Sequence, residues 1–244
     1  MDIVIDRRPA HVGGLKRLTT AVAVALALVA AAPAGAATRD DAIGKLDQYN
    51  SDKARTLAST HHAQLVSLYD GIYHCLPWVD IHKQGIGFRK PKWAQQDDRY
   101  LATWIIIDQK DDGYFGTFPR ERRASLMFSR YGVDLLRRMV ALQGVAGDPA
   151  VQGYGVVLSW TKPGTDKPGM QPVNESLVFW VDKSVAQGYL ARRVSSADLT
   201  SRARYTMFDG IEEQGRLPLE VWDDNFTKTY QIKDYQLAKG VSCN

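Results

Sequence analysis

The N-terminal 36 residues have the residue order of a secretory signal peptide, and this feature limits what the rest of the chain can be. Four basic residues precede an apolar run at residues 21–32, and the small-residue triplet Ala34-Gly35-Ala36 follows it. The apolar run is too short and too rich in alanine to span a bilayer, which needs about 20 strongly apolar residues. We therefore expect residues 1–36 to be a cleaved signal peptide and residues 37–244 to be one α+β globular domain.

Removing this leader changes the charge of the chain. The full sequence has a net charge of +4, but the leader carries four basic and two acidic residues, which leaves 27 Lys and Arg against 25 Asp and Glu. A nearly neutral chain lacks the basic excess that is typical of nucleic-acid binding. We expect a periplasmic or secreted protein with no nucleic-acid partner, no cofactor and no transmembrane segment in the mature chain.

The sequence has two cysteines, Cys75 and Cys243. An exported protein with an even number of cysteines usually pairs them, so we expect a disulfide between these two residues. Two free thiols and an intermolecular bond are the alternatives. A bridge that closes so long a loop stabilises the fold by about 2–5 kcal/mol.

Helical periodicity appears in two stretches. Apolar residues recur at helical spacing between residues 38 and 76, where Asn50-Ser51-Asp52 offers a break between two helices. A second helix is predicted from Pro119 to about Gln143, since Pro suits the first turn of a helix. A short helix is also predicted to begin at Ser195 or Ser196.

Strand patterns follow a different order along the chain. Residues 101–107 are rich in β-branched side chains, and residues 154–160 and 177–181 alternate as a hairpin does. We predict a second hairpin from residues 217–222 and 226–232, and an irregular connection over residues 76–93, with two Pro and two Gly. The fold predicted from this order is α+β, an antiparallel sheet of about 4–6 strands packed against two long helices in a single domain.

Catalytic candidates are few. Asp70 and His74 are four residues apart on a predicted helix, which places an acid beside an imidazole, and His82 follows in the irregular connection. With a carboxylate from residues 108–112, they would make a metal-assisted or general acid/base hydrolase. Recognised zinc spacings, serine-nucleophile motifs and nucleotide-binding loops are missing from the sequence, so we expect no metal site and favour binding over catalysis.

Three arginines recur every seven residues along the second predicted helix: Arg123, Arg130 and Arg137. Guanidinium groups in a row can hold phosphate or carboxylate groups. Asp134, however, lies four residues after Arg130 and three before Arg137, which is typical of a solvated helix face that compensates its own charge. The functional alternative is contact with an anionic component or an acidic protein of the cell envelope.

Aromatic residues gather around the irregular connection. Trp78 and Trp93 lie in it with His82, and aromatic rings in loops bind sugars and apolar ligands. We therefore expect an exported, soluble protein that binds a small ligand or an envelope protein through this segment. The alternatives are the hydrolase described above and a structural or assembly component of the cell envelope.

Overall fold

The computed structural model describes residues 38–108, 114–166, 169, 171–226 and 243, and the predicted signal peptide lies outside them. A single six-stranded sheet dominates the fold, with the spatial order β1-β2-β3-β4-β5-β6. Neighbouring strands are antiparallel except β2 and β3, which are parallel. The strands are β1 (Val79–Arg89), β2 (Arg99–Ile107), β3 (Val151–Thr161), β4 (Asn174–Asp182), β5 (Arg204–Asp209) and β6 (Glu212–Gly215).

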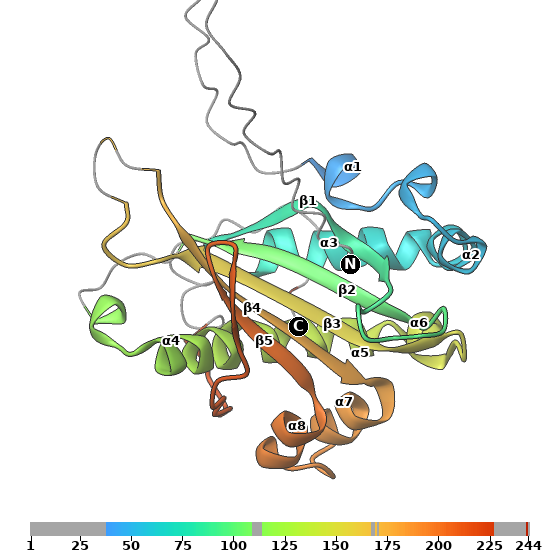
Figure 1. The fold of residues 1–244 in the computed structure, drawn as a ribbon. Helices are drawn as coiled ribbons and strands as arrows, with labels where there is room; N and C mark the ends of the chain where they lie inside the picture. The colour runs from blue at the N-terminus through green and yellow to red at the C-terminus, as the bar shows by residue number, and fades with distance from the viewer. Residues whose placement is uncertain (1–37, 109–113, 167–168, 170, 227–242, 244) are drawn as a thin grey trace, which may run out of the picture.

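Helices cover one face of this sheet (Figure 1), where α3 contacts β1, and α5 contacts both β3 and α3. Two long helical segments form this layer, one made of α2 and α3 and the other of α4, η3 and α5, and short helices join them to the strands. The helices are α1 (Arg39–Ala42), η1 (Leu46–Gln48), α2 (Asp52–Thr60), α3 (His62–Cys75), η2 (Phe115–Thr117), α4 (Arg120–Met127), η3 (Phe128–Gly132), α5 (Val133–Ala141), α6 (Gln143–Gly147), α7 (Lys183–Leu190) and α8 (Ser196–Arg202).

The core lies between the helices and the sheet. Alternate residues of β3, including Tyr154, Val156 and Leu158, are fully buried against the helical layer. Strand β4 buries Leu177 and Phe179 on the same face. Because successive side chains of a strand point to opposite faces, the residues between them form the outer face of the sheet.

The predicted α+β fold is confirmed, with one difference in the sheet. The sheet is mixed, since β2 and β3 run parallel. A parallel pair needs a long crossover, and the chain makes it through α4, η3, α5 and α6. The predicted hairpin of β3 and β4 is confirmed by their antiparallel register, in which Leu158 lies opposite Leu177.

The predicted helices are present but are interrupted. In the N-terminal stretch, α2 begins where a break was predicted, and Ser51 caps it by accepting a 3.2 Å hydrogen bond from the Ala54 amide. The second long helix contains a π-helical turn at Phe128–Gly132, where a Cβ on Gly132 would overlap the Phe128 ring. Ser195 caps α8 as predicted.

The prediction of an irregular connection at residues 76–93 is wrong for most of its length, because β1 occupies Val79–Arg89. The register with β2 shifts between Ile81 and Ile86, and Gln84 has a positive φ of 56°. This irregularity interrupts the alternation of apolar side chains by which a strand is recognised in sequence.

The predicted C-terminal hairpin is also wrong in its first half. Residues 217–222 form no strand, and residues 227–232 lie outside the described part of the chain. The strands that extend the sheet are instead β5 and β6, which pair as Phe208 with Glu213 and Asp209 with Glu212.

The predicted disulfide is confirmed. Cys75 at the end of α3 is bonded to Cys243, with a Cα–Cα distance of 5.4 Å. The bridge joins residues 168 positions apart, so it ties the C-terminal end of the chain to the helical layer.

Polar contacts also join segments that are distant in sequence, and two of them, one buried and one partly buried, lie between major elements. Glu175 on β4 is fully buried and accepts hydrogen bonds from both Arg123 and the Trp160 indole. His61, between α2 and α3, lies 2.8 Å from the Asp148 carboxylate. This hydrogen bond is the main reason that the pKa of Asp148 is lowered from its ordinary value.

Candidate functional site

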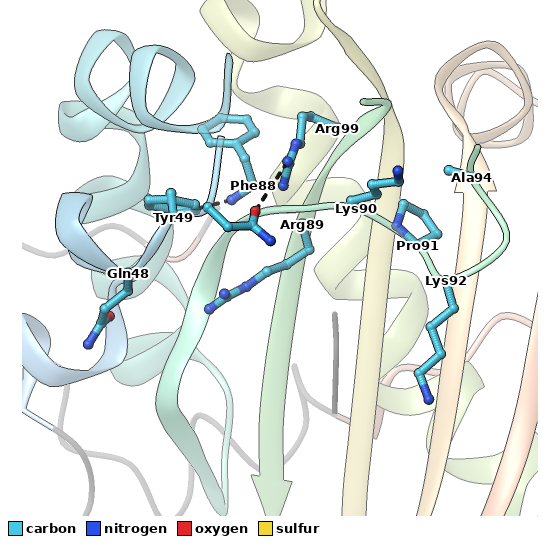
Figure 2. A pocket seen from close by; sticks show the side chains of 10 residues that line it. Gln48, Tyr49, Phe88, Arg89, Lys90, Pro91, Lys92, Ala94 and Arg99 are labelled. Carbon is cyan, nitrogen blue, oxygen red and sulfur yellow. Dashed lines mark hydrogen bonds between the residues drawn. The ribbon is translucent and has the colours of Figure 1, made fainter. Parts of the chain in front are cut away.

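A cationic pocket of about 410 Å³ lies where β1 ends and β2 begins. Figure 2 shows that one wall comes from η1 and the residues that follow it, and the other from the end of β1 and the loop after it. We call this the Arg89 pocket. Its lining residues are Gln48, Tyr49, Asn50, Phe88, Arg89, Lys90, Pro91, Lys92, Ala94 and Arg99.

The lining of the Arg89 pocket contains four basic residues and no acidic one. Two other cavities differ in this respect. One is lined mainly by aromatic and apolar side chains, and the other, of about 570 Å³, has Arg130 and Arg137 facing Asp134, Asp223 and Asp224. Of these three cavities, the Arg89 pocket is the best suited to an anion.

Arg89 is the last residue of β1, and its guanidinium is partly withdrawn from water. It donates a 2.6 Å hydrogen bond to the Gln84 carbonyl oxygen and lies 5.8 Å from the centre of the Tyr49 ring. Among the described residues, none of the acidic side chains pairs with it. Burial lowers the pKa of Arg89, and the neighbouring Arg99 lowers it further, while Tyr49 opposes the shift. The Gln84 carbonyl and the Tyr49 ring are both neutral, so these contacts do not give the Arg89 guanidinium a counter-ion.

Arg99 fixes the opposite wall. Its guanidinium donates a 2.8 Å hydrogen bond to the Ser51 hydroxyl and pairs with Asp97. The side chain is almost fully buried, with 6% exposed. Because Ser51 also caps α2, Arg99 links the start of that helix to the start of β2. We regard Arg99 as a part of the wall whose charge is already compensated.

The remaining cations come from the loop after β1. Lys90 donates a hydrogen bond of 3.2 Å to the Gln95 carbonyl oxygen. Lys92 is exposed, and no ion pair with an acid holds it within the described chain. Arg89 and Lys92 thus provide positive charges that an incoming anion can neutralise. A guanidinium and an ammonium are the groups that most often bind phosphate and carboxylate in proteins.

The predicted catalytic residues do not form one site. Asp70 lies 3.8 Å from Arg39, and no hydrogen bond joins it to His74 in the part of the chain described here. His82 is on the outer face of the sheet, stacked on the Trp104 ring at 3.7 Å, whereas α3 packs on the helical face. Burial lowers the pKa of His82. Most of residues 108–112 lie outside the described chain.

The predicted binding residues are also distributed over different places. Trp78 packs against the core and contacts Phe226, at a ring distance of 5.4 Å. Trp93 borders the aromatic cavity, beside Lys92 of the Arg89 pocket. Trp93 thus lines a cavity, as expected of a residue that binds a ligand, whereas Trp78 packs against the core.

Each arginine of the predicted stripe has an acidic partner. Arg123 pairs with the buried Glu175, and Arg130 lies 3.6 Å from Asp224. Arg137 lies 3.0 Å from Asp134, as expected for a helix face that compensates its own charge. Arg123 and Arg137 donate hydrogen bonds to their acidic partners, whereas the Nε of Arg130 faces Asp224 without a hydrogen bond.

Reasoning from the sequence did not single out Arg89, Lys92 or Tyr49. The run from Arg89 to Lys92 contains three basic residues in four positions, which could have indicated an anion site. These charges entered the sequence analysis only as part of the net charge of the chain. The contribution of Tyr49 could not have been found, because 40 residues separate it from Arg89 and the fold alone brings them together.

Among the residues that the structure describes, no group of three or more His, Cys, Asp or Glu side chains is placed to hold a metal ion. In the same residues, no helix has the length and apolar character needed to cross a membrane. Comparison of the chain with protein-family models, with curated proteins and with solved structures found no match.

Proposed function

We propose that the protein is an exported binding protein for a small anion that carries a phosphate or carboxylate group, held in the Arg89 pocket. The observation that carries this proposal is the partly buried guanidinium of Arg89, which has no acidic partner among the described residues and faces a cavity lined by further cations. A buried charge without a counter-ion is costly, so an anion that supplies one gains affinity.

Binding suits this pocket better than catalysis does. Its lining contains no carboxylate, imidazole or thiol that could act as a general base or nucleophile. Apart from the four basic side chains, Tyr49 is the titratable group of the lining, and burial raises its pKa, which keeps the phenol protonated at neutral pH. A protonated phenol and several cations can together hold an anion by donating hydrogen bonds.

Isothermal titration calorimetry with inorganic phosphate and with citrate tests the proposal. Arg89→Gln removes the uncompensated charge and should raise the dissociation constant about 10–100-fold, since a hydrogen bond to a charged group contributes about 1.5–3 kcal/mol. Lys92→Ala should weaken binding by a smaller factor, because an exposed charge is screened by solvent.

Two variants serve as matched controls. Arg202→Gln and Lys83→Ala each remove one exposed charge outside the pocket and should leave the dissociation constant unchanged. If the wild type binds neither anion at low ionic strength, or if Arg202→Gln weakens binding as much as Arg89→Gln does, the proposal is wrong.

Export is the second part of the proposal. It is supported by the disulfide between Cys75 and Cys243, since such bonds persist in oxidising compartments. Mass spectrometry of the protein from its native host should find an N-terminus at residue 37 and no alkylatable thiol. An intact leader together with two free thiols would contradict export.

A further inference from the structure

A second cavity, of about 230 Å³, lies beside the Arg89 pocket on the outer face of the sheet. Its walls are mostly aromatic and apolar, so we call it the aromatic pocket. Its lining residues are Lys92, Trp93, Val178, Trp180, Arg204, Tyr205, Thr206, Phe208 and Glu213.

The wall formed by Trp180 depends on a glycine of the neighbouring strand. Trp180 on β4 lies opposite Gly155 on β3, where a Cβ would overlap the indole ring. The missing side chain lets the ring lie flat against the sheet. Tyr100 meets this ring edge to face at 5.7 Å and donates a 2.8 Å hydrogen bond to Asp182. The outer face therefore has a small apolar cluster of its own, centred on Trp180.

Trp93 completes the aromatic pocket from the loop after β1. Its ring contacts Trp180 edge to face at 5.8 Å and Tyr100 at 6.4 Å. The Arg204 guanidinium lies 5.1 Å from its centre. These contacts hold the loop against the sheet, although 36% of Trp93 remains exposed.

The two pockets meet at Lys92, which lines both of them. A ligand that reaches from one to the other therefore passes an ammonium group. Arg204, over the Trp93 ring, adds a second cation to the lining, and the acid Glu213 already accepts a 3.2 Å hydrogen bond from the Thr206 hydroxyl. The charge at the rim of the aromatic pocket thus favours a ligand with negative charge next to its apolar part.

We propose that the ligand is an amphipathic anion, whose phosphate or carboxylate group binds in the Arg89 pocket and whose apolar group binds against Trp93 and Trp180. This inference rests on the proposed function, because it needs an anion in the Arg89 pocket. Together the two cavities have the volume of a site for a drug-sized ligand, and the smaller one limits the apolar group to a small ring system or a short alkyl chain.

Calorimetry with three probes tests this inference: inorganic phosphate, phenyl phosphate and octyl phosphate. Both organic phosphates should bind at least 10-fold more tightly than phosphate, because each places apolar surface in the aromatic pocket. The tighter of the two identifies the apolar group as aromatic or as alkyl.

Trp93→Ala should reduce this gain, so that the ratio of the dissociation constants of phosphate and phenyl phosphate falls toward one. Trp93 is exposed enough for the variant to fold, which circular dichroism verifies. Trp222→Ala is the matched control, because Trp222 is partly buried and lies over Arg122 on α4, away from both pockets. It should leave the ratio unchanged.

Equal affinity for all three probes would overturn the inference and leave the proposed function standing. The inference would also be overturned if Trp93→Ala still bound phenyl phosphate more tightly than phosphate by the wild-type ratio. The same holds if Trp222→Ala lowered this ratio as much as Trp93→Ala does. If none of the probes binds, the inference and the proposed function both fail.

Discussion

Replacement of Glu175 by Gln tests the buried ion pair that joins the second long helix to the sheet. The carboxylate accepts three hydrogen bonds: from Nε and Nη2 of Arg123 and, at 2.9 Å, from the Trp160 indole. A Gln amide has one acceptor oxygen and one NH₂ group. In either orientation, the NH₂ group of the Gln would face a donor, and the Arg123 guanidinium would stay buried without its counter-charge.

Breaking a buried pair by removing one partner costs about 3–5 kcal/mol. In a chain of this size, each kcal/mol lowers the melting temperature by about 2–4 °C, so Glu175→Gln should lower it by roughly 6–20 °C. Differential scanning calorimetry measures this shift.

Glu220→Gln is the control for this prediction. Glu220 lies 3.6 Å from Arg122, but its side chain is 79% exposed. Exposed pairs contribute little, so we expect the melting temperature of this variant to stay close to that of the wild type. If Glu175→Gln unfolds at the same temperature as Glu220→Gln, the pair does not stabilise the fold as we argue.

Three further predictions concern stability. The double variant Cys75→Ser and Cys243→Ser should lose about 2–5 kcal/mol of unfolding free energy in urea denaturation, and an unchanged midpoint would contradict the role of the bridge. The lowered pKa of Asp148 means that its hydrogen bond with a histidine stabilises the fold above about pH 4, and that this contribution is lost as the pH falls further. The stability difference between the wild type and Asp148→Asn should therefore be present at pH 7 and shrink toward pH 3; a constant difference would refute this. Gly155→Ala should displace the Trp180 ring, change the near-ultraviolet circular dichroism and cost about 1–3 kcal/mol, whereas an unchanged spectrum would show that the sheet accommodates the methyl group.

The parts of the fold that could be predicted are those in which local pattern and burial agree. Strands β3 and β4 alternate regularly, with Tyr154 and Leu177 facing the core, so their hairpin was recognisable. The disulfide was predicted from the number of cysteines together with the expectation of export. The parallel pairing of β2 with β3 was not predictable in this way, because the partner of a strand is decided by tertiary packing.

Strand β1 was missed because it is irregular. The positive φ of Gln84 and the register shift beside it interrupt the two-residue alternation over which a strand is recognised. Strand β6 is an edge strand and β5 lies next to it; both are short and contain many polar residues, so the sequence pattern did not indicate strands there.

The candidate site was only partly accessible from sequence. Trp93 was expected to bind a ligand, and it does line a cavity. The Arg89 pocket was not expected, because its character depends on which cations lack an acidic partner. The sequence does not distinguish one arginine from another, but Arg123 pairs with an acid whereas Arg89 has no acidic partner among the described residues. This difference arises only when the chain is folded.

Nuclear magnetic resonance of the arginine side chains tests the central claim most directly. In a titration of the protein with inorganic phosphate at low ionic strength, the Nε–Hε resonance of Arg89 should shift and saturate. The resonance of Arg202, which is exposed and lies outside the pocket, should stay in place. Equal, unsaturable shifts at both arginines, or no shift at Arg89, would contradict an anion site at the junction of β1 and β2.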